Sequence, residues 1–160
     1  MQSVTIIAVG RIKERFFTEA ASEYIKRLKA YCRLEIIEIK DEPTPENPSA
    51  RERDIVLRAE GERIMKKIPK GATVISLCVE GIKMSSEKLA AYISDCASSG
   101  KSSLVFIIGG SFGLSDEVKA ISTLKLSFSD MTFPHQLMRI ILLEQIYRAY
   151  TITQGKTYHK

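Results

Sequence analysis

The chain has 160 residues, of which 44% are hydrophobic and 27% are charged, and its net charge is +5. This length and composition fit one globular domain over residues 1–160, and no apolar run approaches the roughly 20 residues that a membrane helix needs. The positive charge favours a polyanionic partner, but many basic proteins bind no nucleic acid, so charge alone selects no function.

The first half of the chain alternates between strand-like and helix-like segments. Residues 3–9 (SVTIIAV) form a continuous β-branched run, which is typical of a buried strand in a parallel sheet. Apolar residues at helical spacing predict a helix over residues 16–30, and a second strand is expected over residues 34–39. Three prolines exclude regular structure in residues 43–48, after which Ser49 can cap a helix that reaches Lys67.

The second half continues this alternation. Strands are predicted over residues 73–79, 104–108 and 124–128, with a loop over residues 80–83 and a helix from the Ser85 and Ser86 caps to about Ser98. A last helix can begin at Pro134, because the fixed φ of proline suits a first helical turn. Strands that alternate with helices predict an α/β fold, with a mostly parallel sheet covered by helices on both faces.

Three segments should meet at one edge of this sheet. Ligands of such sheets bind beyond the carboxyl ends of the strands. The segments that follow strands there are residues 77–81, 109–113 and 127–133. We therefore expect a binding site built from these three segments.

The last helix carries two narrow polar seams rather than one polar face. His135, Gln136 and Arg139 form one seam, and Glu144, Gln145 and Arg148 form the other. We interpret this pattern as a helix covered both by its own core and by a partner subunit. The alternative is a broad-faced core helix whose Glu144 and Arg148 pair on its surface.

The glycine-rich segment 109–113 (GGSFG) allows close backbone approach to a ligand. It does not match G-x-G-x-x-G, although Asp130 lies about where a ribose-binding acid would be expected. A nicotinamide-dependent oxidoreductase is therefore the least favoured function for this chain. A plain glycine-rich turn without a ligand is the other alternative.

Neither the cysteines nor the histidines form a metal-ligand pattern. Cys32, Cys78 and Cys96 suit neither a disulfide framework nor a zinc site, and His135 and His159 lack acidic companions. We expect no metal, and we expect a reducing, cytoplasmic location.

The C-terminal residues 155–160 gather an aromatic ring, an imidazole and two cations. Tyr158 can stack on an unpaired base while Lys156 and Lys160 reach phosphates. A disordered tail is the alternative.

Several segments together resemble the ribosomal RNA large-subunit methyltransferase H family of the SPOUT superfamily. They are VGRIKERF (9–16), EYIKRL (23–28), EGIKMSSE (80–87), FIIGGSFG (106–113), LSFSDMTFPHQLMRIILLEQIYRA (126–149) and the terminal YHK. The resemblance covers the whole chain. It implies a C-terminal part tied in a deep trefoil knot, a homodimer, and S-adenosylmethionine bound in the knot. The implied substrate is a pseudouridine in a stem-loop of 23S rRNA, methylated at N3 within the assembled ribosome.

The resemblance also implies which residues bind the cofactor. These are Leu77, Gly109, Gly110, Gly113, Phe128, Ser129, Asp130, Met131, Thr132 and Phe133. For catalysis we expect Tyr158 to orient the target base, His159 to help remove its proton or stabilise charge, and Arg139 to serve the RNA or the dimer interface. Thr157 departs from the family pattern, which often has proline there, and Arg11 replaces a frequent lysine.

A non-catalytic ribosome-binding or assembly factor is the competing function. It would use the same basic surface but would need no cofactor cavity.

Overall fold

The computed structural model describes residues 1–160 and contains one five-stranded sheet in the order β2-β1-β4-β3-β5. The strands are β1 (Ser3–Val9), β2 (Arg33–Ile39), β3 (Thr73–Lys83), β4 (Ser103–Ile108) and β5 (Leu124–Ser127). Every neighbouring pair is parallel. The predicted α/β fold with a parallel sheet is confirmed, whereas the deep knot stays a prediction.

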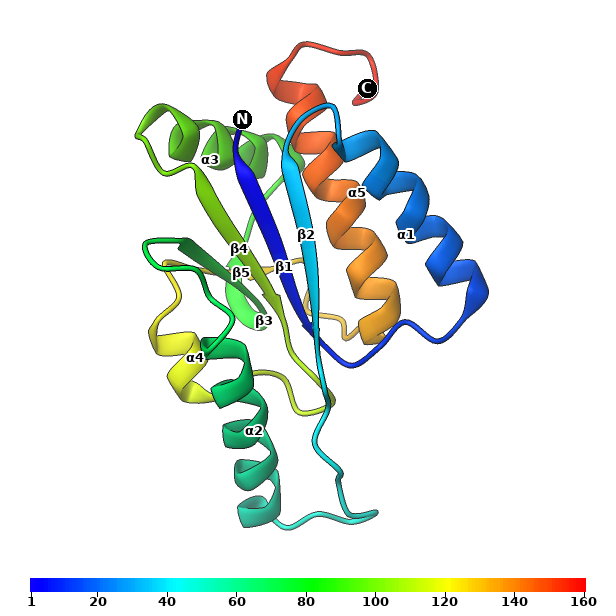
Figure 1. The fold of residues 1–160 in the computed structure, drawn as a ribbon, viewed down its shortest axis with the longest axis vertical. Helices are drawn as coiled ribbons and strands as arrows, with labels where there is room; N and C mark the ends of the chain where they lie inside the picture. Colours follow the sequence, from blue (N-terminus) through cyan, green and yellow to red (C-terminus); the bar gives the residue numbers. More distant parts are fainter.

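Helices cover both faces of the sheet (Figure 1). They are α1 (Arg15–Leu28), α2 (Ala50–Met65), α3 (Ser86–Ser98), α4 (Asp116–Ala120) and α5 (His135–Thr153). Helix α5 packs between α1 and α3 on one face, and α2 packs with α4 on the other. None of the five helices combines the length and the apolarity that crossing a membrane requires.

The two faces of β1 supply two separate hydrophobic clusters. Val4, Ile6 and Ala8 belong to the larger cluster, under α1, α3 and α5, whereas Ile7 and Val9 belong to the smaller one, under α2 and α4. Successive side chains of a strand point to opposite faces, so a strand buried on both sides is mostly apolar. This is why residues 6–9 form an uninterrupted apolar run.

Two elements differ from the sequence-based expectation. Strand β3 continues through residues 80–83, which we expected to be a loop, because Ile82 and Lys83 resume pairing with β5. Leu77 and Ile82 both lie opposite Leu126, so the four residues between them bulge out of the register. Helix α4 was not anticipated, because five residues are too few to show a helical period.

The two chain termini lie at the same end of the molecule, opposite the carboxyl ends of the strands (Figure 1). The Tyr150 hydroxyl joins the two ends of the chain by donating to Gln2 Oε1 at 3.0 Å. Helix α5 therefore begins near the carboxyl edge of the sheet and ends near the amino edge.

Candidate functional site

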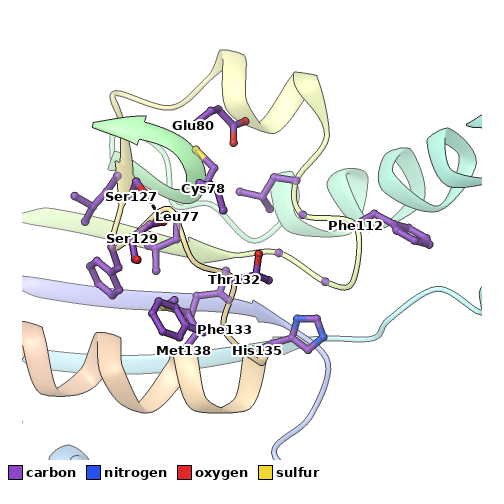
Figure 2. A pocket seen from close by; sticks show the side chains of 18 of the residues that line it. Leu77, Cys78, Glu80, Phe112, Ser127, Ser129, Thr132, Phe133, His135 and Met138 are labelled. Carbon is purple, nitrogen blue, oxygen red and sulfur yellow. Dashed lines mark hydrogen bonds between the residues drawn. The ribbon is translucent and has the colours of Figure 1, made fainter. Parts of the chain in front are cut away.

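A cavity of about 340 Å³ lies at the carboxyl edge of the sheet, where the bulged part of β3 and the segments after β4 and β5 meet the start of α5. Figure 2 shows side chains from all of these segments around it. The structure thus brings residues 77–80, 109–113 and 127–133 together, as the strand order requires.

A tight glycine turn forms one side of this cavity. The Gly113 N–H donates to the Gly110 carbonyl at 3.0 Å, and Gly113 has φ +82°, a conformation that favours glycine. A Cβ on Gly109 would lie 2.4 Å from the Gly113 carbonyl oxygen, so no side chain fits there. Phe112 points away from the cavity (Figure 2), and the Arg53 guanidinium lies 5.3 Å from the centre of its ring.

Helix α2 supports the glycine turn from behind. A Cβ on Gly110 would lie 3.0 Å from Glu60 Oε1, and one on Gly61 would lie 2.5 Å from Ser115 Oγ. Glu60 is only 4% exposed; its Oε2 accepts from the Glu42 N–H at 3.0 Å, and its Oε1 has no hydrogen-bond partner. Burial therefore raises the pKa of the Glu60 carboxyl.

The remaining walls are mainly apolar, with polar groups at defined places. The apolar side chains are those of Leu77, Ile108, Leu126, Phe128, Phe133 and Met138. The turn after β5 is held by hydrogen bonds in which Ser127 Oγ donates to the Ser129 carbonyl at 3.1 Å and the Met131 N–H donates to Ser129 Oγ at 3.0 Å. At the β3 bulge Glu80 pairs with Lys119, which lowers the Glu80 pKa.

Nine of the ten cofactor-binding residues expected from the resemblance line the cavity. The exception is Asp130, whose carboxylate forms an ion pair with Lys83 instead. Lys119, His135 and Met138 also line the cavity, although they lie outside the three segments expected from the sequence. They belong to α4 and to the first turn of α5, and only the tertiary structure brings these elements to the cavity.

The C-terminal tail lies at the other end of α5. The Tyr158 hydroxyl donates to Glu144 Oε1 at 3.0 Å, and its ring packs edge-on against Tyr147 with centroids 4.8 Å apart. The His159 ring lies between Arg148, 3.0 Å from its Nδ1, and Glu87, 2.8 Å from its Nε2. Partial burial, together with hydrogen bonds to Tyr24 and Glu144, raises the pKa of Tyr158.

Arg139 is separate from both the tail and the main cavity. Its side chain is buried, donating to Glu38 Oε2 at 2.7 Å and to the Gly10 carbonyl at 3.0 Å, while its Nε has no partner. Desolvation acts to raise the Glu38 pKa, but hydrogen bonds from Arg139 and the Ile12 N–H outweigh it, so this pKa is lowered. Both polar seams of α5 thus have partners within the chain. The first meets β2 and the turn after β1, and the second meets the tail and α3.

No group of three His, Cys, Asp or Glu side chains is arranged to hold a metal ion. The cavity is formed by its apolar walls and its glycine turn.

Comparison with known proteins identifies the family. Residues 2–159 match the family model described as "Predicted SPOUT methyltransferase". The chain belongs to the SPOUT methyltransferase family. Within this SPOUT family, it is 54% identical over 158 residues to a protein of Clostridioides difficile (strain 630) named ribosomal RNA large subunit methyltransferase H, and the match covers 99% of each chain.

Two further comparisons agree with this assignment. A protein of the same name from Carboxydothermus hydrogenoformans is 54% identical over 157 residues, covering 98% of this chain and 99% of the relative. The crystal structure of tRNA (m1G37) methyltransferase from Aquifex aeolicus matches with a TM-score of 0.54 at 14% identity, covering 91% of this chain and 69% of that one. The structural likeness supports the shared SPOUT fold.

Proposed function

We propose that this protein uses S-adenosylmethionine to methylate N3 of a pseudouridine in a 23S rRNA stem-loop within the assembled ribosome. The observation that carries the proposal is the glycine-walled cavity at the carboxyl edge of the sheet, in a SPOUT methyltransferase. The names of the full-length relatives support a ribosomal RNA substrate. The choice of nucleotide and atom rests on the sequence resemblance.

The residues of the cavity fit S-adenosylmethionine. The Gly113 carbonyl occupies the place that a side chain on Gly109 would need, so the glycine turn closes tightly at the wall of the cavity. The apolar walls of Leu77, Leu126 and Phe128 would hold the purine ring, and the serine-rich turn after β5 offers polar groups beside them. Such a mixture of apolar walls and few polar groups is usual for cofactor sites.

The chain's own contribution to methyl transfer is positioning and proton handling. When bound, S-adenosylmethionine supplies a methyl group on a positively charged sulfur that acts as the leaving group. The nitrogen that attacks must lose its proton and approach in line, so a rigid wall and a nearby base both raise the rate. We assign base orientation to Tyr158 and proton removal or charge stabilisation to His159.

No residue of the tail lines the cavity of its own chain. Tyr158 contacts Glu144 at the middle of α5, and His159 contacts Arg148 and Glu87. We therefore propose a homodimer in which the tail of one subunit completes the cavity of the other. The contacts of the tail with Glu144, Arg148 and Glu87 would then represent its conformation before RNA binds.

The proposed function is tested by rRNA mass spectrometry and by titration calorimetry with S-adenosylmethionine. A strain that lacks this protein should miss one methyl group on 23S rRNA, and the purified protein should restore that group to its ribosomes. If the protein bound S-adenosylmethionine specifically but restored no methyl group to the ribosomes, the proposed rRNA substrate would be wrong. Ribosome binding with no cofactor affinity, even when ribosomes are present, would favour the non-catalytic factor.

A further inference from the structure

A second cavity of about 600 Å³ opens beside the first, where the turn after β1 and the end of β2 face the start of α5. Gly110, Ser111 and His135 line both cavities. A ligand held in the second cavity would therefore adjoin a ligand held in the first. The function proposed above makes no use of this second cavity.

The lining of the second cavity is polar and carries a surplus of positive charge. Only two of its 13 lining residues are hydrophobic. Its cationic side chains are Arg11, Lys13, Lys40 and Arg139, and its acidic ones are Glu38 and Asp41. Because Glu38 is already paired with Arg139, the three exposed cations face one unpaired carboxylate. This balance favours an anionic ligand.

The turn that carries two of these cations is held in place by side chains from distant elements. The Ile12 N–H donates to Glu38 Oε2 at 3.1 Å, and the Lys13 N–H donates to Gln136 Oε1 at 2.9 Å. Arg139, which is buried, holds the Gly10 carbonyl at 3.0 Å and keeps one further N–H, its Nε, without a partner. The backbone is thus fixed, while the Arg11 and Lys13 side chains are exposed and make no ion pair.

The kind of anion follows from what the cavity lacks. Apart from the His135 imidazole, no lining residue has an aromatic ring on which a base could stack. Fixed cations without a stacking surface suit the sugar-phosphate backbone of a nucleic acid rather than its bases. A strand held there would run directly past the opening shared with the first cavity.

We propose that this second cavity binds the phosphate backbone of the RNA next to the target nucleotide, with Arg11, Lys13 and Lys40 as the phosphate ligands. The inference rests on the proposed function, because it places the strand relative to the base to be methylated. It assigns the RNA contact to the turn after β1 rather than to the basic outer face of α1, which carries Lys26 and Lys29.

The test compares two double variants with equal loss of charge. Arg11→Ala/Lys13→Ala removes two cations from the cavity, and Lys26→Ala/Lys29→Ala removes two exposed cations from α1 and its C-cap. The substrate is 70S ribosomes from a strain lacking the protein, and methylation is measured at saturating S-adenosylmethionine over a range of salt concentrations. Cofactor affinity, measured by calorimetry, should be unchanged in both variants.

We expect the cavity variant to raise the KM for ribosomes roughly tenfold with little change in kcat, and to lower the slope of log KM against log salt by about 0.7 for each lost phosphate contact. The α1 variant should retain wild-type values. Equal kinetics and equal salt slopes in the two variants would overturn the inference while leaving the proposed function standing.

Failure of the proposed function would look different, because the wild-type protein itself would then methylate no ribosomes. Co-sedimentation with the same ribosomes would still test the cavity in that case. Weaker binding by the cavity variant alone would support the cavity, and equal binding by both variants would refute it.

Discussion

Glu60 and Gly109 show how single residues set the shape of the candidate site. Glu60 places a buried carboxylate, with one unpartnered oxygen, directly behind Gly110. Gly109 faces the Gly113 carbonyl at a distance that admits no Cβ. One residue supports the glycine turn and the other allows it to close, so substitution of each should have a distinct effect.

Gly109→Ala should abolish cofactor binding, because the new methyl group would push the Gly113 carbonyl out of the turn. Overpacking of this kind costs about 1–3 kcal/mol of stability. Calorimetry with S-adenosylmethionine measures the binding, and Ser102→Ala serves as the control because Ser102 is exposed and lines neither cavity. Unchanged affinity in the Gly109 variant would show that the turn does not contact the cofactor.

Glu60→Gln should change how stability depends on pH. The raised pKa means that the folded protein keeps this proton to higher pH than the unfolded chain does. The free energy of unfolding therefore falls as pH rises above the ordinary carboxyl pKa of about 4.3, and it stops falling above the folded pKa. Glutamine removes this loss, so the variant should be more stable than wild type at pH 8 by about 1 kcal/mol.

Urea unfolding between pH 5 and pH 8 measures this difference. Glu62→Gln is the matched control, because Glu62 lies in the same helix and is exposed. If the free energy of unfolding of the Glu60 and Glu62 variants changed with pH as it does in the wild type, the buried Glu60 carboxyl would not cause the pH dependence of stability.

At the scale of elements, α2 matters because it carries the residues that support the glycine turn. Its N-terminus has a complete capping box, in which the Glu52 N–H donates to Ser49 Oγ at 3.1 Å and the Ser49 N–H donates to Glu52 Oε1 at 3.3 Å. Its apolar contacts are few, since only Val56 and Ile64 are buried hydrophobic residues. The cap should therefore contribute a sizeable part of its stability.

Ser49→Ala should lower the free energy of unfolding by about 1 kcal/mol, because the Glu52 N–H loses its partner. Ser22→Ala in α1 is the control, since Ser22 is exposed within a helix and alanine favours helix there. Thermal unfolding of both variants checks the prediction. Equal midpoint temperatures of unfolding for the Ser49 variant and the wild type would mean that packing alone stabilises α2.

Elements with a strong local signal could be predicted from the sequence, and elements that depend on distant partners could not. The apolar runs of β1 and β4 and the serine cap of α2 are local signals. The extension of β3 over residues 80–83 depends on pairing with β5, more than 40 residues later, and no local sequence pattern predicts it. The short α4 shows only its cap, Ser115, whose Oγ accepts from the Val118 N–H.

The same contrast holds for the candidate site. Its three strand-end segments follow from the parallel topology, which the sequence indicates, and nine of the ten expected cofactor residues share one cavity. The second cavity was not anticipated, because Gln136 and Arg139 reach the turn after β1 from more than 120 residues away. Such contacts depend on the packing of α5 and have no counterpart in sequence spacing.

At the scale of the whole molecule, the tail is separate from the cavity, because Tyr158 contacts the middle of α5 and no tail residue lines the cavity. This separation makes the proposed homodimer testable by mixing two inactive variants. Gly109→Ala keeps an intact tail, and His159→Ala keeps an intact cavity. Co-expressed, they should recover about a quarter of wild-type activity, because half of the dimers are mixed and each has one complete site.

Methylation of ribosomes by the mixture measures this recovery, and each variant alone gives the baseline. A mixture as inactive as its components would mean that each tail serves its own chain or has no catalytic role. Light scattering should show a dimer for the wild type and for both variants.

The interior position of β1 in the sheet also determines when the chain can fold. Strand β1 pairs with β4, where Ser3 lies opposite Ser103, and its Val4 and Ile6 share a cluster with Leu142, Leu143 and Ile146 of α5. A nascent chain lacking α5 would expose this apolar face, and contacts so distant in sequence form slowly. The core can therefore be completed only after α5 has been synthesised.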